Sequence, residues 1–471
     1  MPDLPAPKGW RWVPLPEIAR LESGHTPSRR HPEYWNGDIP WIGIKDARQG
    51  HGKTLNETLQ MVTEAGLENS AARLLPADTV CLSRTASVGY CTIMGRPMAT
   101  SQDFVNWVCS DAIDPKFLQQ LFLAEKDSLL EFGKGTTHKT IYYPEVKAFH
   151  VCLPPLDEQR RIVSKIESLF ARSRRAKEAL DAIPPLLDRL RQSILAAAFR
   201  GDLTADWRAQ NPDVEPADKL LERIPTPKRP ARFKSRSTRV EAGLSALSLG
   251  TPDVQPPENW CWALLLDVAS LGSGHTPSRR HPEYWDGDIP WVSIPDARDN
   301  HGGTILETTS RITPAGLENS AARMLAKNSV LLCRTAASIG YVVKLGASMA
   351  TSQDMVSWTC TEALEPDLLL RLLEAEKPSL LRFSKGSAHK TVYFPEILSF
   401  NVCLPPVAEQ REILRRIEER LRMLERLRAK VTSLRARLAE LEPSILASAF
   451  SGQLIHESGI NSGARQQMFD F

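Results

Sequence analysis

Basic and aromatic side chains stand together near the start of the chain, in the combination with which proteins contact nucleic acids. Residues 29–31 (Arg-Arg-His) come shortly before Tyr34 and Trp35. Arginine and lysine can bind phosphates or the edge of a guanine, and a glutamine can bind an adenine. These residue types indicate a DNA ligand. Tyr34, Trp35 and Trp41 also fit a hydrophobic core, and we expect these three aromatic residues to be buried.

The candidate DNA contacts lie in segments that we expect to be loops. Arg84 and Arg334 lie in turns, and residues 134–142 form a basic loop with an aromatic residue. Gln102 and Gln353 could bind adenine. In the first half of the chain the candidates are His25, Thr26, Arg29, Arg30, Lys45, Arg84, Gln102, Lys134, Thr137, His138, Lys139 and Tyr142, and in the second half they are His275, Thr276, Arg279, Arg280, Arg334, Gln353, Lys385, His389, Lys390 and Tyr393.

The sequence contains no recognisable catalytic apparatus. It has no Gly-x-Gly fingerprint after a strand, no Asn/Asp-Pro-Pro-Tyr/Phe motif for adenine methylation and no Walker A loop. A nuclease-like site around Asp288 and Asp296 is a weak alternative, because Asp38 and Asp46 repeat the pair while the lysine at 45 is a proline in the second copy. The ten histidines match no common zinc spacing. We therefore expect neither a catalytic residue nor a metal site.

The candidates occur twice because the chain contains an internal repeat. Of the 26 positions in 24–49, 21 are identical in 274–299. SILAAAF at 193–199 recurs as SILASAF at 444–450. The period of about 250 residues is far longer than the 20–50 residues of solenoid and propeller units. The chain therefore contains one module of about 200 residues twice.

Each copy begins with mixed secondary structure and ends with a helical part. In the first copy we expect strands at 39–44, 79–83, 87–93, 103–109 and 149–153, and one amphipathic helix at 115–132. These elements predict an α+β domain that is closed by Pro154-Pro155.

After residue 158, and again in the second copy, apolar residues follow a 4-3-4-3 spacing that indicates a coiled coil. We expect the two helices to pack on each other, Pro184-Pro185 to kink or break the first, and Pro443 to end the second near Glu442. Ser173 and Arg420 are the polar exceptions in the two series. The apolar positions are Ile162, Ile166, Leu169, Ala176, Leu180, Ile183, Leu187, Leu190 and Ile194, and then Ile413, Ile417, Leu424, Leu427, Val431, Leu434, Leu438, Leu441 and Ile445.

The domain boundaries follow from the repeat. The centre of the segment between the copies, 228–239, carries six basic residues and no acidic one, so we expect it to be extended and solvated. We predict a first domain at 1–155, a first helix at 156–200, a linker at 201–256, a second domain at 257–406, a second helix at 407–454 and a C-terminal tail at 455–471.

The composition is that of a soluble globular protein, with 42% hydrophobic and 24% charged residues and a net charge of +3. This small net charge does not by itself indicate DNA binding, because the distribution of charge matters more. The chain has no C-x-x-C pair among its eight cysteines, no signal-peptide pattern and no run of 18 apolar residues. We therefore expect a cytoplasmic protein with reduced thiols.

The motifs of the repeat resemble those of type I restriction–modification specificity subunits. The one departure is Ser387-Ala388 in place of Thr136-Thr137, so we expect the second loop to contact DNA differently. The matching motifs are Ser-Gly-x-Thr-Pro-Ser at 23–28 and 273–278, Tyr-Trp-x-Gly-Asp-Ile-Pro-Trp at 34–41 and 284–291, the loops at 135–139 and 386–390, Pro-Pro-x-x-Glu-Gln-x-x-Ile at 154–162 and 405–413, and Ala-Phe-x-Gly-x-Leu at 198–203 and 449–454.

The resemblance implies two target-recognition domains of α+β fold, related by a pseudo-twofold axis and separated by a long antiparallel coiled coil of two helices. It implies a non-catalytic subunit that reads bipartite double-stranded DNA with two modification (adenine methyltransferase) subunits and ATP-driven restriction subunits. S-adenosylmethionine, ATP and magnesium would then belong to the partners, and this chain would need no cofactor.

Two alternatives stay open. One is the specificity partner of a methylation-only or two-subunit defence system, which neighbouring genes would identify. The other is a stand-alone methyltransferase or nuclease, which an activity assay on the purified chain would detect.

The closeness of the two copies adds an expectation about the target. Two like domains about a twofold axis contact like sequences on opposite strands. We therefore expect an interrupted, palindromic or near-palindromic target. The halves could differ where the copies differ, at Gly43/Ser293, Lys45/Pro295, Gln49/Asp299 and Thr137/Ala388.

Overall fold

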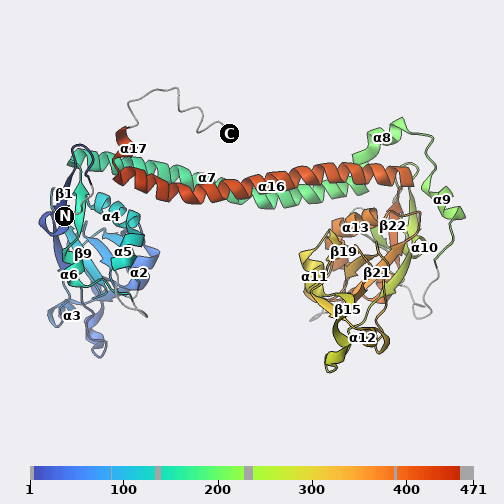
Figure 1. Cartoon of the computed structure of the whole chain (residues 1–471), viewed down its shortest axis with the longest axis horizontal. Helices are drawn as coiled ribbons and strands as arrows, with labels where there is room; N and C mark the ends of the chain where they lie inside the picture. Colours follow the sequence, from blue (N-terminus) through green and yellow to red (C-terminus); the bar gives the residue numbers. More distant parts are fainter. Residues whose placement is uncertain are drawn as a thin grey trace. The chain divides into compact units, whose positions relative to one another are not determined.

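The computed structural model describes residues 5–85, 87–132, 139–227, 237–244, 246–386 and 390–456 of the chain. The chain divides into two compact units, Met1–Asp181 with Thr432–Phe471 and Ala182–Val431. Each unit contains one α+β domain and one half of each of two long helices, α7 (Leu156–Phe199) and α16 (Val407–Phe450) (Figure 1).

The described residues of the first domain form three small sheets and six short α-helices. The helices are α1 (Leu15–Ile18), α2 (Ile44–Gln49), α3 (Glu64–Glu68), α4 (Pro115–Ala124), α5 (Lys126–Phe132) and α6 (Tyr143–Lys147). In spatial order, the sheets are β2 (Ala19–Ser23), β9 (Phe104–Cys109), β6 (Val80–Ser83), β7 (Cys91–Met94) and β4 (Thr54–Leu55); β5 (Gln60–Val62), β3 (Trp35–Ile42) and β8 (Ala99–Thr100); and β1 (Arg11–Pro14) with β10 (His150–Leu153).

The second domain repeats this order, and two further strands, β11 and β12, extend its third sheet. Its helices are α10 (Leu265–Val268), α11 (Ile294–Asp299), α12 (Pro314–Glu318), α13 (Pro366–Ala375), α14 (Lys377–Phe383) and α15 (Phe394–Ile397). Its sheets are β14 (Ala269–Ser273), β21 (Met355–Cys360), β18 (Val330–Cys333), β19 (Val342–Leu345) and β16 (Thr304–Ile305); β17 (Ser310–Ile312), β15 (Trp285–Val292) and β20 (Ala350–Thr351); and β11 (Glu241–Ala242), β12 (Leu247–Leu249), β22 (Phe400–Leu404) and β13 (Cys261–Leu264).

The predicted strands are found, with shifted ends. The prediction 39–44 was displaced, because β3 ends at Ile42 and the next residues start helix α2. The single helix expected at 115–132 is wrong: α4 ends at Ala124 and α5 starts at Lys126. Helix α4 buries one face, with Phe117 and Phe122 in the domain core, as expected of an amphipathic helix.

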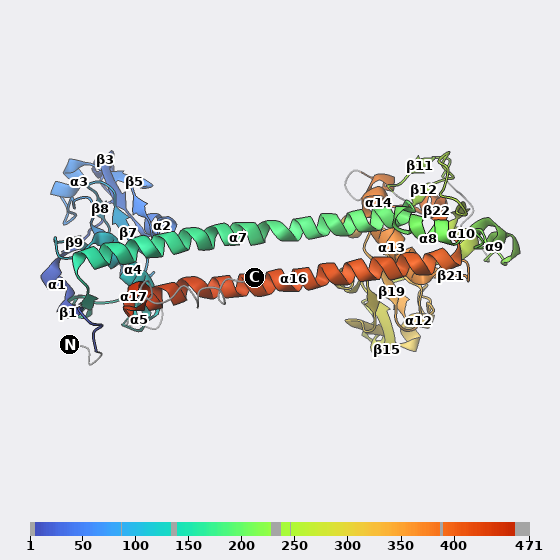
Figure 2. The same cartoon turned by 90° about the horizontal axis from the view of Figure 1, so that it is seen from above.

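The two long helices are antiparallel within each unit. In the first unit, the first half of α7 lies beside the last half of α16 (Figure 2), and Ser173 donates a hydrogen bond to Glu442 at 3.2 Å. In the second unit Arg191 of α7 lies 3.9 Å from Glu425 of α16. Residue numbers therefore rise along one helix as they fall along the other. This confirms the prediction that the two helices pack on each other. It also explains why a polar residue is found at position 173, because the Ser173 hydroxyl has a hydrogen-bond partner between the helices.

The prolines do not end the helices where we expected. Helix α7 continues through Pro184-Pro185 to Phe199, so a break is wrong there, and α16 continues through Pro443 to Phe450. Apolar residues that follow the prolines are buried against the domains, including Phe199 in the second domain's core and Ile445 in the first. Their burial outweighs the helix hydrogen bond that each proline removes.

The predicted heptad series is also only partly right. Leu190, Leu427 and Leu441 are 40–47% exposed, so they lie outside the seam. In α16 the buried residue near the predicted exception Arg420 is its neighbour Leu421. A helix of 3.6 residues per turn drifts against a strict seven-residue repeat, which shifts the contacting face.

A glutamine fixes the start of each long helix to its own domain. Gln159, fully buried, donates to the carbonyls of Pro154 and Ala112 and accepts from the amide of Asp114 at 2.8 Å. Gln410 makes the equivalent three hydrogen bonds in the second domain. The Glu-Gln pair of the repeated motif is therefore a structural junction.

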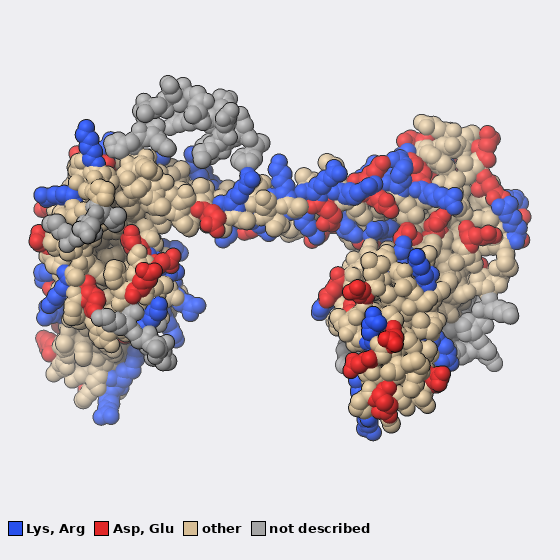
Figure 3. Space-filling model, viewed as in Figure 1, with Lys and Arg blue, Asp and Glu red and all other residues tan. Residues whose placement is uncertain are grey.

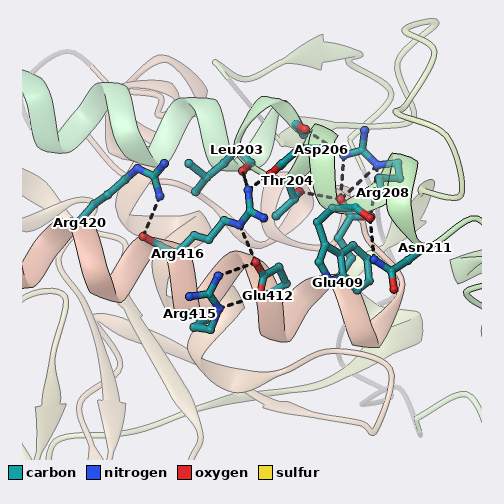
Figure 4. A network of polar contacts seen from close by, with 12 residues as sticks. Leu203, Thr204, Asp206, Arg208, Asn211, Glu409, Glu412, Arg415, Arg416 and Arg420 are labelled. Atoms are coloured by element: carbon teal, nitrogen blue, oxygen red, sulfur yellow. Dashed lines mark hydrogen bonds and ion pairs between the residues drawn. The ribbon is translucent and has the colours of Figure 1, made fainter.

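The start of α16 is held by a buried ionic network (Figure 4). Glu409 is 1% exposed and accepts hydrogen bonds from Arg208 (2.7 Å), Thr204 (2.7 Å) and the indole of Trp260 (2.9 Å). In the segment after α7, Thr204 is the N-cap residue of α8 (Ala205–Gln210) and Arg208 lies within that helix. The predicted linker therefore contains ordered contacts, and it also contains α9 (Ala217–Arg223), β11 and β12. Of the basic stretch 228–239, residues 228–236 lie outside the described residues.

Candidate DNA interface

The segment that carries Gly24 and His25 is held in place by contacts of residues that recur in the second copy. A Cβ on Gly24 would lie 2.1–2.4 Å from atoms of Thr100 and Ser101, so only glycine fits there. The amide of His25 donates to the carbonyl of Thr100 at 2.9 Å, and the indole of Trp41 donates to the carbonyl of His25 at 3.1 Å. His25 itself stays exposed. These bonds fix the backbone of the loop and leave the His25 side chain exposed.

Three candidates meet at residue 102. Thr26 donates to the side-chain carbonyl of Gln102 at 2.6 Å, and the guanidinium of Arg84 donates to the main-chain carbonyl of Gln102 at 3.2 Å. Arg84 also stacks on Tyr143, 4.8 Å from the ring centroid. We call Thr26, Arg84 and Gln102 the first polar cluster.

The second domain builds the same cluster from Thr276, Arg334 and Gln353, the second polar cluster. Arg334 donates twice to the main-chain carbonyl of Gln353 and lies over Phe394. Burial lowers the pKa of Arg334 from its ordinary value, but an arginine stays charged at neutral pH. The side-chain oxygen of Gln353 accepts from both the amide and the hydroxyl of Thr276, at 2.9 and 2.8 Å. Both lone pairs are then used, so Gln353 can offer only N–H donors to a ligand.

The neighbouring arginines lie on tryptophans. Arg29 lies 4.3 Å above the ring of Trp35 and donates to Gln60 at 2.9 Å, while Arg279 lies 3.6 Å above Trp285. Arg30 and Arg280 are exposed. The aromatic residues follow the core prediction only in part. Trp41, Trp285 and Trp291 are buried, whereas Tyr34 and Trp35 are half-buried.

A cavity of about 450 Å³ opens beside the first polar cluster. Lys45 lines it and is exposed. Its counterpart in the second domain is Pro295, which has no donor. The other lining residues are Arg29, Trp41, Gly43, Ile44, Asp46, Leu59, Gln60, Ser101 and Asp103.

The predicted basic loops are described in part. Lys139 is exposed and donates to the carbonyl of Leu130 at 3.2 Å, at the end of α5. Tyr142 is 52% exposed and Tyr393 46%. Lys385 forms an ion pair with Glu396 at 2.5 Å, which leaves it less available for DNA, and Lys390 is exposed. Lys134, Thr137, His138 and His389 lie outside the described residues.

Two of the four aspartates of the nuclease alternative have structural roles. Asp46 and Asp296 are 6% and 4% exposed and cap their helices. The two carboxylate oxygens of Asp46 accept from the amides of Gly43 and Leu59. Asp296 binds Ser293 and Thr309 in the same way. Both residues are therefore structural. Within the described ranges, no group of three or more His, Cys, Asp or Glu residues is placed to hold a metal ion.

On the face seen in Figure 3, lysine and arginine are interspersed with aspartate and glutamate.

None of the described helices has both the length and the apolar character needed to cross a bilayer.

The comparison with known families agrees with this duplicated architecture. The sequence profile for the type I restriction modification DNA specificity domain matches residues 7–183 and again 257–433. The chain belongs to this family. Each match covers one domain and the first part of its long helix.

Individual proteins similar to this chain are also specificity subunits of type I restriction enzymes. The chain is 29% identical over 338 residues to the type I restriction enzyme MjaIX specificity subunit of Methanocaldococcus jannaschii, covering 71% of this chain and 68% of that one. It is 24% identical over 469 residues to the EcoDI specificity subunit of Escherichia coli, covering 95% and 89%. The HsdS subunit from Thermoanaerobacter tengcongensis has the same fold, with a TM-score of 0.61, 18% identity and coverage of 96% and 99%.

Sequence reasoning missed several residues of this specificity domain. Gln60 orients Arg29, Tyr143 supports Arg84, and Ser101 and Asp103 line the cavity. Ser101 and Asp103 flank Gln102 in the repeated MATSQD motif, which was a usable signal. Gln60 gave no such signal, because the equivalent residue of the second copy is Ser310.

Proposed function

We propose that the chain is the non-catalytic subunit that gives a type I restriction–modification complex its DNA sequence specificity. One observation carries this proposal: the chain builds the same polar cluster twice, around Gln102 and around Gln353, with matching hydrogen bonds. Two such clusters, on two domains of a specificity family, fit a target with two half-sites.

The donors in and around the clusters suit DNA. Arg30, Arg280 and Lys45 are exposed cations that can neutralise phosphates or donate to guanine. Gln102 keeps one acceptor position and its N–H donors, so it can pair with adenine, whereas Gln353 offers donors alone. The two half-sites would then be similar but not identical.

The chemistry would come from partners. In this proposal two modification subunits bring S-adenosylmethionine and methylate adenine, and restriction subunits use ATP and magnesium to cleave. This chain would bind and orient double-stranded DNA for them in the cytoplasm, without a cofactor of its own. A stand-alone nuclease is disfavoured because Asp46 and Asp296 are occupied in helix caps.

The test is reconstitution with labelled S-adenosylmethionine and DNA from an unmethylated host. We expect no methyl transfer by the purified chain, and sequence-specific adenine methylation once the cognate modification subunit is added. Labelling by the chain alone, or identical labelling by the modification subunit without the chain, would contradict the proposal.

A further inference from the structure

The third sheet differs between the two domains. In the second domain β22 lies between two strands: β13 pairs along one edge and β12 along the other, with Leu247 opposite Val402 and Leu249 opposite Phe400. In the first domain the equivalent strand β10 pairs with β1, and the described residues place no strand on its other edge. An uncovered strand edge offers unpaired N–H and C=O groups to any extended peptide.

A buried glutamate holds the covering segment in the second domain. Glu376 is fully buried and accepts from the amides of Leu244 and Ala246, each at 2.8 Å, and from the hydroxyl of Ser379 at 2.6 Å. The amide of Cys403 in β22 donates to the carbonyl of Ala246 at 2.9 Å.

The first domain carries the same acceptor, and no described residue is bound to its side chain. Glu125 and Ser128 occupy the positions of Glu376 and Ser379 in the repeat. Glu125 is exposed, and within the described part of the chain no hydrogen bond or ion pair reaches its carboxylate. The site therefore retains the carboxylate that, in the second domain, binds the backbone of the covering segment.

The apolar floor of the site is also preserved. The rings of Phe383 and Phe400 lie 6.2 Å apart, and both are fully buried with Leu247 and Leu249. Their counterparts Phe132 and Phe149 are likewise 6.2 Å apart, but Phe132 is 52% exposed and Phe149 is only half-buried.

The course of the chain points to the occupant. In the second unit, the covering strand belongs to the segment that follows α7. The segment that follows α16 starts in the same way: Gly201 and Gly452 have φ of +80° and +78° and pack against Pro257 and Pro7. After Gly452, Leu454 packs on the core of the first domain.

Residues 457–471, which follow Leu454, have a sequence pattern and a length that suit the site. The last three, Phe469-Asp470-Phe471, have the apolar–polar–apolar pattern of Leu247-Ser248-Leu249. The 15 residues from 457 to 471 can span at most about 50 Å when extended.

We propose that the free edge of β10, with Glu125, Phe132 and Phe149, is a docking site for an extended peptide, and that its occupant is the chain's own C-terminal segment, residues 457–471. The segment adds a strand to β10, places alternate phenylalanines on Phe132 and Phe149, and donates backbone N–H groups to Glu125. This inference does not depend on the proposed function.

Hydrogen exchange at β10 tests the proposal. The full chain is compared with a chain that ends at residue 456 and with Phe469→Ser/Phe471→Ser. We expect exchange over residues 148–153 to become about tenfold faster, or more, in both variants. Gln466→Ser/Gln467→Ser is the matched control in the same segment and should exchange like the full chain. Exchange over β22 should be equal in all four proteins and reports that they are folded.

A synthetic peptide of residues 457–471 completes the test. Added to the truncated chain, it should restore slow exchange at β10, and the truncated chain without peptide should self-associate through the uncovered edge. Equal exchange at β10 in the full and truncated chains would overturn the proposal. Slow exchange that arises only when a partner subunit is added would assign the site to that partner and would equally overturn it.

Discussion

Lys45 is a side chain at which the two domains differ in chemistry. It is exposed at the cavity beside the first polar cluster, and no hydrogen bond or ion pair reaches its ammonium within the described residues. An ammonium there can donate to the O6 and N7 atoms of a guanine. Pro295, at the same position in the second domain, cannot. Lys45 is therefore the clearest candidate for a base that only one half-site specifies.

A reciprocal exchange tests this candidate. Lys45→Pro should be compatible with the fold, because Pro295 lies in the first turn of the equivalent helix α11, where proline is tolerated. We expect it to cost about 1–3 kcal/mol of discrimination at one base pair of one half-site. Pro295→Lys should add a guanine preference to the other half-site. The methylated sequences selected from randomised half-sites measure both effects.

The unchanged half-site serves as the internal control in each variant. If both variants select the original sequences, Lys45 does not contact a base.

The basic loops lead to a second prediction at this scale. Lys139→Ala or Lys390→Ala should weaken DNA binding. For a phosphate contact the loss is uniform across sequences and the salt dependence becomes shallower by about one unit of slope. For a base contact, about 1–3 kcal/mol is lost on the cognate site alone. Titrations at several salt concentrations distinguish the two, and unchanged binding by both variants would remove these lysines from the interface.

The types of the candidate residues could be predicted from sequence, but their partners could not. The repeat identified Thr26, Arg84 and Gln102, yet nothing in their spacing showed that Thr26 and Arg84 both donate hydrogen bonds to Gln102. Lys385 looked like a free cation until the fold brought Glu396 to it. Such contacts depend on tertiary structure, so local patterns cannot specify them.

At the scale of elements, the two helix starts are built differently. Glu409 lies in a buried network with Arg208, Thr204 and Trp260. Its counterpart Glu158 is half-buried and, among the described residues, accepts one hydrogen bond, from Trp10 at 3.2 Å. The start of α16 is therefore held by a buried ion pair with Arg208 that has no counterpart at Glu158 in the described part of the chain.

Glu409→Gln should destabilise this junction by about 3 kcal/mol, because Arg208, whose side chain is only 14% exposed, loses its charged partner. The matched control Glu158→Gln should cost about 1 kcal/mol or less, since it weakens one neutral donor's bond. Native-state hydrogen exchange over α8 and β13, and over β1 for the control, measures both. Equal losses in the two variants would show that the ion pair adds nothing to the junction.

Element types followed from periodicity, whereas element ends followed from packing. The heptads predicted two helices that pack on each other, and the family resemblance implied that they are antiparallel. The structure confirms both. The prolines were misjudged because Phe199 and Ile445, which lie beyond them, are buried in domain cores. The cost of a proline can be read from sequence, but the burial that outweighs it cannot.

At the scale of the whole molecule, the repeat predicted the two domains and the fold class. It could not predict that residues 247–249, between the copies, form a strand of the second domain, because the offset of about 250 residues pairs them with no residue of this sequence. The similarity of the two polar clusters bears on the target itself. Two like readers bind like sequences on opposite strands when they are related by a twofold axis.

The most direct test is to map modified adenines in the DNA of cells that express this chain with its modification subunit and no other methyltransferase. The account predicts an interrupted target whose two half-sites are inverted copies of each other apart from about one base pair. Each half should have about 3–4 specified base pairs, with centres about one helical turn apart. Two half-sites without inverted similarity, or a single continuous target, would contradict it.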